Sequence, residues 1–107
     1  MANTFKNQGA ALTTGGAIVY AAPGATTSII HSCYISNIDG SNSVDVDIKA
    51  RATSGDTYYH VAKAVPVPAG STLVLDKPID LEATGDVQMT ASVNSDAEAV
   101  LGILEIT

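Results

Sequence analysis

The sequence predicts an all-β protein: an antiparallel β-sandwich, immunoglobulin-like or jelly-roll-like, with about seven or eight short strands. Nine glycines and four prolines interrupt the 107 residues at intervals of about a dozen residues, which limits helix length. The segments between these turns mostly alternate apolar and polar residues with a period of two. Aromatic residues are only 5% of the chain and Trp is absent, so the core has to be built from aliphatic side chains.

The first eleven residues differ from the rest of the chain. Residues 1–11 are mostly small or polar, and Phe5 is their only large apolar anchor. We therefore expect an N-terminal arm over 1–11 that is mobile in the free subunit and ordered only against a partner. Residues 12–107 contain no linker or composition shift and are expected to form a single β-sandwich domain.

Strands are predicted in seven segments, namely 17–21, 26–38, 43–51, 57–65, 71–75, 86–93 and 96–106. The alternation is clearest over 43–51, where aliphatic residues occupy one face and charged residues the other. Together with 86–93, this segment supplies the expected core residues Val44, Val46, Ile48, Val87, Met89 and Ala91. Pro66 and Pro68 remove ladder hydrogen-bond donors, so their stretch is an edge strand or a crossover.

Two of these segments also fit a helix. In 26–38 the β-branched content favours a strand. In 96–106 one helical face is apolar and Asp96 is a suitable N-cap. Against the helix, residues Ala97 to Ile103 alternate regularly, and Gly102 would cost a helix interior about 1 kcal/mol. We therefore predict strands for both.

The charge balance excludes several partners. Five basic and eleven acidic residues give a net charge of −6, and the basic residues are scattered rather than gathered as a phosphate-binding face requires. We therefore expect no direct nucleic-acid contact and no binding to an anionic membrane. The N-terminus has no signal-peptide pattern and no segment is long and apolar enough to span a bilayer, so the expected site of synthesis is a reducing cytoplasm.

Residues that could carry chemistry are few. Cys33 is the single cysteine and lies among isoleucines, which indicates a buried, inert thiol. His31 falls on the same face of the predicted strand, but no motif surrounds the pair, and His60 lies on another strand. Asp45 and Asp47 alternate with valines, which is typical of a solvated outer face. We expect no catalytic residue, no metal site and no cofactor, and therefore no enzyme.

Surface contacts are therefore the expected functional feature. The candidates are the anchor of the arm, the exposed turns and one ring of the aromatic pair at 58–59. These candidate partner contacts are Phe5, Pro23, Gly24, Tyr58, Pro66 and Pro68.

Several segments resemble a group of small virion structural proteins of tailed bacteriophages. The matching pieces are "LTT" at 12–14, "IVYAAPG" at 18–24, "YISN" at 34–37, "YYHVAK" at 58–63, "VPAGS" at 67–71, "LEATGDV" at 81–87 and "LEI" at 104–106. The resemblance covers residues 12–107 and is a pattern of strands and turns without catalytic residues. It implies a β-sandwich in which the Pro-Ala-Gly elements close turns and "YISN" is a central strand.

The resemblance also implies a function. Proteins of this kind decorate or cement phage capsids, which predicts the major capsid protein or another virion protein as partner, a homo-oligomer and a location in the virion. The acidic balance fits a surface that faces solvent, away from the packaged genome. The alternatives are a neck, tail or fibre accessory protein and a host-surface or carbohydrate-binding module, for which exposed aromatic residues would be the discriminating feature.

Overall fold

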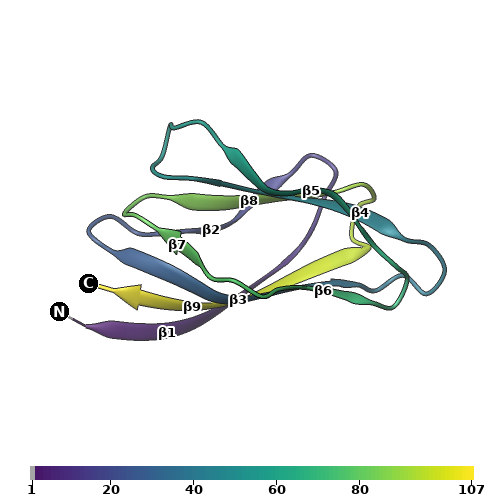
Figure 1. The fold of residues 1–107 in the computed structure, drawn as a ribbon, viewed down its shortest axis with the longest axis horizontal. Coiled ribbons are helices and arrows are strands. Elements are labelled where there is room, and N and C mark those ends of the chain that lie inside the picture. Colours follow the sequence, from purple (N-terminus) through teal and green to yellow (C-terminus); the bar gives the residue numbers. More distant parts are fainter. Residues whose placement is uncertain (1) are drawn as a thin grey trace.

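The computed structural model describes residues 2–107, and all its regular elements are strands (Figure 1). The strands are β1 (Asn3–Ala11), β2 (Ala17–Ala21), β3 (Thr27–Asn37), β4 (Val44–Arg51), β5 (Tyr59–Val67), β6 (Thr72–Leu75), β7 (Ile79–Leu81), β8 (Asp86–Ala91) and β9 (Ala97–Ile106). The predicted all-β antiparallel sandwich is confirmed, with slightly more strands than predicted. The molecule is elongated, measuring 47 × 26 × 20 Å.

Two antiparallel sheets form the layers of the sandwich. Sheet A has the order β1-β9-β3-β6, with β7 also paired to β3, and sheet B has the order β2-β8-β4-β5. The strand pairs enclose one another in sequence about the β4–β5 loop, as in one long hairpin rolled up on itself. From the innermost outward they are β4–β5, β3–β6/β7, β2–β8 and β1–β9. This arrangement is the jelly roll, with β6 and β7 as two halves of one strand.

The core lies between the two sheets and is aliphatic. All six residues expected there are buried, each at 2% exposure or less, namely Val44, Val46, Ile48, Val87, Met89 and Ala91. They pack with the inward side chains of β3 and β9, including Ile30, Ile35, Leu101 and Ile103. The alternation of β4 therefore predicted both the strand and the face that it buries.

The N-terminal segment is a correction to the sequence prediction. Residues Asn3–Ala11 do not form an arm outside the sheet but strand β1, which pairs antiparallel with β9 along its whole length without a bulge. The backbones of Ala2 and Thr107 also bond each other, so both ends of the described chain lie together (Figure 1). All residues of β1 except Ala10 are exposed. The strand is therefore fixed by its backbone ladder, which composition does not reveal.

Three other details differ from the prediction. β7 was missed because it has only three residues and follows Pro78. Val93, which the alternation over the predicted strand 86–93 would turn inward with Ala91, is 44% exposed, since β8 ends at Ala91. In β3, a bulge between Ile30 and Ser32 leaves His31 exposed and Cys33 buried, so the two do not share a face. The helix weighed for 96–106 is excluded, because Ala97–Ile106 is strand β9.

Candidate interaction surface

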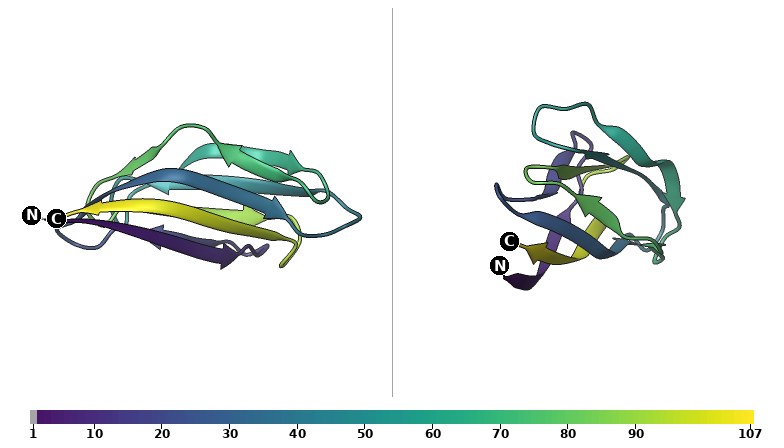
Figure 2. Two further views of the ribbon diagram at one scale, coloured as in Figure 1. Left: turned by 90° about the horizontal axis from the view of Figure 1, so that it is seen from below. Right: turned by 60° about the vertical axis from the view of Figure 1, so that its left-hand side comes forward.

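The outer face of sheet A carries a group of apolar side chains. Cross-strand pairing places Phe5 beside Leu104 and Leu104 beside Ile29 in one row across β1, β9 and β3. A second row runs across β9, β3 and β6 and consists of Val100, Tyr34 and Val74. We call these six side chains the apolar face. Figure 2 (left) views the molecule from this side, with β1, β9 and β3 next to one another.

The apolar face is well exposed to solvent. Phe5 is 75% exposed, Val74 53%, Val100 51% and Tyr34 45%. Exposed apolar side chains occur singly on most soluble proteins, whereas a contiguous patch marks an interaction site. Four of them lie here on one sheet, which makes this face the strongest candidate for a binding surface.

A histidine joins the two rows of the apolar face. His31 lies over Gly102, where an added Cβ would come within 2.7 Å of the imidazole Cε1. The ring of Phe5 meets the ring of His31 edge to face, with 6.1 Å between centroids. The glycine at 102 therefore makes room for the imidazole, and the bulge in β3 turns His31 outward to occupy it. The sequence analysis considered His31 only as a partner of Cys33.

The two outer faces of the sandwich differ in charge. On sheet B the outward residues of β4 are Asp45, Asp47, Lys49 and Arg51, as the sequence predicted. On sheet A the outward positions of β1 and β3 carry no Asp, Glu, Lys or Arg, and Glu98 and Asp80 lie at the borders of the apolar face. The centre of the apolar face therefore holds no Asp, Glu, Lys or Arg side chain that would have to be desolvated on binding.

A buried carboxylate fixes β1 to the body of the protein. Glu105 is 8% exposed and accepts a hydrogen bond from the Tyr20 hydroxyl, which also bonds Ser28. Lys6 of β1 reaches the same carboxylate, with 3.4 Å between Nζ and Oε1. Burial, and then the hydrogen bond to Glu105, raises the pKa of Tyr20 to about 12. The hydroxyl is therefore a proton donor at neutral pH, and β1 gains one ionic contact.

A second polar cluster lies at one end of sheet B. Asp86 is 2% exposed and accepts hydrogen bonds from Arg51 Nε, at 2.9 Å, and from the Tyr58 hydroxyl. The guanidinium carbon of Arg51 lies 4.5 Å from the centroid of the Tyr58 ring. The hydrogen bond to Asp86 raises the pKa of Arg51, and burial, then Asp86, raises that of Tyr58. Every member of this cluster is paired, so its role is to hold β4 and β8 to the start of β5.

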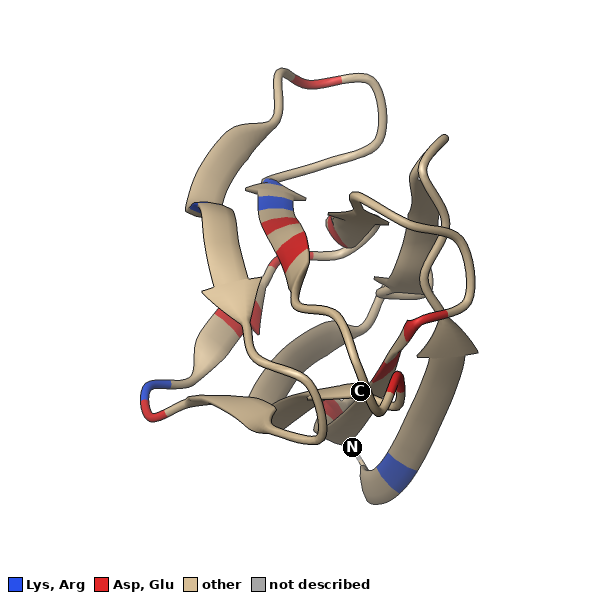
Figure 3. Ribbon diagram, turned by 90° about the vertical axis from the view of Figure 1, so that its right-hand side faces the viewer, with Lys and Arg blue, Asp and Glu red and all other residues tan. Residues whose placement is uncertain are grey.

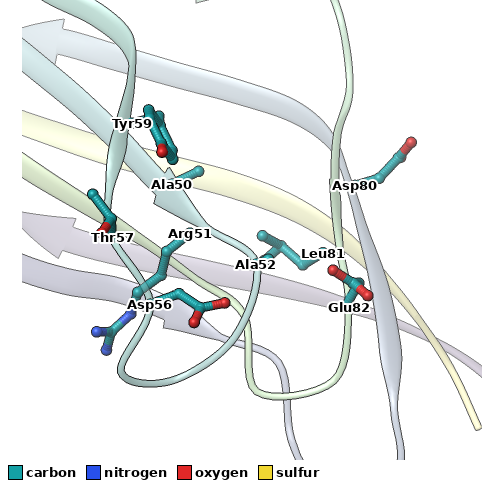
Figure 4. Close-up of a pocket in the computed structure, with 9 residues that line it drawn as sticks. All are labelled: Ala50, Arg51, Ala52, Asp56, Thr57, Tyr59, Asp80, Leu81 and Glu82. Carbon is teal, nitrogen blue, oxygen red and sulfur yellow. The ribbon is translucent and has the colours of Figure 1, made fainter.

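A cavity of about 520 Å³ opens beside this cluster between the β4–β5 loop and β7. Figure 4 shows the nine residues that line it. Arg51 is engaged with Asp86, and the carboxylate of Asp80 points away from Asp56. Within residues 2–107, no group of three His, Cys, Asp or Glu side chains is placed to hold a metal ion. The cavity therefore presents no convergent set of catalytic groups.

The predicted contact residues do not lie on one surface. Phe5 belongs to the apolar face, while Pro23 and Gly24 form the exposed β2–β3 turn at one end of the molecule. Pro66, in edge strand β5, and Pro68, in the turn after it, are also exposed. The β2–β3 and β5–β6 connections lie toward opposite ends of the molecule (Figure 1). Tyr58 is half-buried and bonded to Asp86, and the exposed ring of the aromatic pair is Tyr59, at 74%.

Sequence reasoning missed five of the six residues of the apolar face. A usable signal was present in β9, which carries apolar residues in both alternating sets of positions, whereas β4 is apolar at one set and charged at the other. A strand that is apolar on both faces is typical of a sheet covered on both sides. Here the molecule itself covers one side only.

Comparison with known proteins gives a fold relation and no family. The sequence matches no family model and no curated protein. Among solved structures, the chain is similar to a protein of the disulfide-linked pili that form Bacillus endospore appendages, with a TM-score of 0.59 and 15% identity over 99% of this chain and 87% of that one. A more distant likeness, TM-score 0.48 and 12% identity, covers 96% of this chain but 32% of VP2 from the subviral particle of infectious bursal disease virus. At this identity the pilus protein shows a shared fold.

Proposed function

We propose that the protein is a non-enzymatic structural subunit, and that it decorates or cements the capsid of a tailed bacteriophage by binding the major capsid protein. The observation that carries this proposal is the apolar face of sheet A, which is exposed, free of charge at its centre and opposite a charged outer face. A subunit with one apolar and one charged face can bury the first against a lattice and keep the second in solvent. The location that follows is the virion, after synthesis in the host cytoplasm.

The jelly roll supports a structural role. The fold occurs in viral capsid and lectin domains, and the similar pilus protein belongs to an assembled fibre. A decoration subunit also needs only a modest interface per copy, because many copies on one lattice add their contacts. The two apolar rows, with His31 between them, would supply such an interface.

Assembly of this protein would be non-covalent. Its single cysteine, Cys33, is 2% exposed in the core, and burial raises the pKa of the thiol to about 11. A buried thiol with little thiolate at neutral pH is unsuited to disulfide exchange with a neighbour. In this respect the protein differs from the disulfide-linked pili whose fold it shares.

Locating the chain in purified particles tests the proposal. We expect a particle reconstruction to show it on the outer face of the capsid with sheet A turned toward the coat. Finding it in the tail tube, baseplate or a fibre would overturn the capsid assignment, and its absence from particles would overturn the virion assignment as well.

Substitutions test which face binds. Val100→Lys and Tyr34→Lys each place a charge in the apolar face, and we expect both to reduce incorporation into particles. The matched control is His60→Lys, an exposed position of β5 that pairs with Lys49 on the charged face. Equal incorporation of all three variants would contradict a role for the apolar face.

A second candidate function rests on one observation. Tyr59 is 74% exposed at the rim of the cavity that Asp56 and Thr57 also line. An exposed aromatic ring beside polar groups is the feature expected of a carbohydrate- or host-binding module on a neck, tail or fibre. Binding to a glycan array that is lost in Tyr59→Ala would favour this candidate over capsid decoration.

A further inference from the structure

The open edges of the two sheets are not equivalent. Natural sheets protect their edges against pairing with other chains by short strands, prolines, bulges and charged residues. The sandwich has edges at β1 and β6/β7 in sheet A and at β2 and β5 in sheet B. Comparing the four edges for these protecting features shows which edge is available for pairing.

Three of the edges are protected. β2 has five residues and an irregular register between Ile18 and Tyr20. β5 contains Pro66 and an irregular register around Ala64, whose φ is 49°. β6 and β7 have four and three residues, with Pro78 between them. None of these edges presents a long, regular row of backbone donors and acceptors.

β1 has almost none of these protections. It has nine residues, contains no proline, and pairs with β9 without a bulge. Its other side has no strand among residues 2–107, and both of its faces are exposed. Lys6 is its single charged residue. In a monomer this edge would leave nine residues of regular extended backbone open to any other strand.

Charge also favours a second copy at this edge. Two copies of a chain with net charge −6 repel each other, but residues 1–38 contain no acidic residue and Lys6 as their one basic residue. Figure 3 shows β1 with a single blue band and no red. Glu105, the cross-strand neighbour of Thr4, is paired with Lys6. The β1 side is therefore where two copies meet with little like-charge repulsion.

We propose that two copies of this protein associate by antiparallel pairing of β1 with β1, in a two-fold ladder centred on Asn7. This register uses all nine residues and sets Lys6 opposite Gln8 of the second copy, so that no like charges face each other. It also sets Phe5 of one copy opposite Gly9 of the other, so that the Phe5 ring packs over the backbone of a residue that has no side chain. The two A sheets become one continuous sheet, and the two apolar faces lie on the same side of it.

This interface concerns the purified subunit and does not depend on which partner covers the apolar face. Its test is made without particles, so its failure and the failure of the proposed function can be distinguished. Sedimentation of the wild-type chain should change with concentration from one subunit of 10.9 kDa toward a dimer. A single monomeric species at all concentrations would overturn the proposal.

Cysteine substitution tests the register. In Asn7→Cys the two new thiols face each other across the two-fold axis, within reach of a disulfide. In the matched control, Asn3→Cys, each thiol faces Ala11 of the second copy, and the two thiols lie roughly 27 Å apart at 3.4 Å per residue. We expect Asn7→Cys to give a covalent dimer under mild oxidation and Asn3→Cys to give little. Equal cross-linking of the two variants would overturn the register, and no cross-linking of either would overturn the pairing.

Added charge tests the edge itself. Asn7→Lys with Gln8→Lys creates three opposed lysine pairs in the ladder, which should raise the dimer Kd about threefold to a hundredfold. The control has the same charge change on edge strand β5, His60→Lys with Val61→Lys, and should leave the Kd unchanged. If the β5 variant weakens the dimer instead, the interface lies on the other sheet and the proposal is wrong.

Discussion

Removing Arg51 should destabilise the fold far more than its position at a strand end suggests. Arg51 contacts Asp86 through Nε at 2.9 Å and through a terminal nitrogen at 2.8 Å, and its side chain is 17% exposed. In Arg51→Ala the carboxylate of Asp86, at 2% residue exposure, keeps one side-chain partner, the Tyr58 hydroxyl. Breaking a buried ion pair by removing one partner costs about 3–5 kcal/mol. Because Tyr58 still bonds the carboxylate, we expect the lower part of this range, about 3 kcal/mol.

Urea denaturation at pH 7 measures this loss. The midpoint should fall without a change in the m-value, because the surface exposed on unfolding is nearly the same. Arg51→Ala combined with Asp86→Asn should recover part of the loss, since no uncompensated charge then remains in the protein. As a comparison, Lys6→Ala removes the half-exposed partner of Glu105 and should cost about 1 kcal/mol or less. A loss below about 1 kcal/mol for Arg51→Ala, or no recovery in the double variant, would refute the reasoning.

Three further predictions concern single sites. Gly85→Ala should lower the free energy of unfolding, measured by urea denaturation, by about 1–3 kcal/mol, because the added Cβ meets three backbone carbonyls, one at 2.7 Å. The control Gly24→Ala adds its Cβ in open space and should be neutral. Cys33 should react with iodoacetamide in the unfolded chain but not in the native protein, and labelling of the native protein would contradict its burial. Burial raises the pKa of Tyr20 from 10.0 to about 12. The stability that the neutral Tyr20 phenol contributes is therefore complete below pH 10 and is lost as the pH rises from 10 to 12. Tyr20→Phe should therefore flatten the stability profile over that interval, and an unchanged slope would contradict it.

The sequence predicted the fold class because most strands bury one face. The regular alternation of Val44 to Arg51 and of Asp86 to Ala91 states directly which side chains meet in the core. Strand β1 was not predicted because it buries almost nothing, and a ladder of backbone hydrogen bonds to β9 requires no particular side chains. The bulge at His31 was not predicted either, since one extra residue in a strand changes the facing of its neighbours without a strong local signal.

The interaction surface was predicted only in part. Phe5 stood out because it is the one large apolar residue in a polar segment. The other members of the apolar face lie on β3, β6 and β9, and they form one surface only after pairing brings Val100 beside Tyr34 and Tyr34 beside Val74. Alternation assigns each apolar side chain to a core by default, so an exposed apolar row is interpreted as a second buried face. Tyr58 rather than Tyr59 was predicted as the contact residue, because the alternation alone does not tell which of the two rings has an acidic partner.

The nested pairing of the jelly roll has a consequence for how the chain folds. The β4–β5 hairpin joins neighbouring strands, whereas each pair outside it closes a longer loop, and β1–β9 joins the two ends of the described chain. Loop-closure entropy therefore favours an order in which the ladder grows outward from the β4–β5 loop. Such a topology folds slowly, because most of its contacts are distant in sequence. In this order β1 docks last, onto a sandwich whose core is already formed, and for an interval the edge of β9 is open to the β1 of any neighbouring chain.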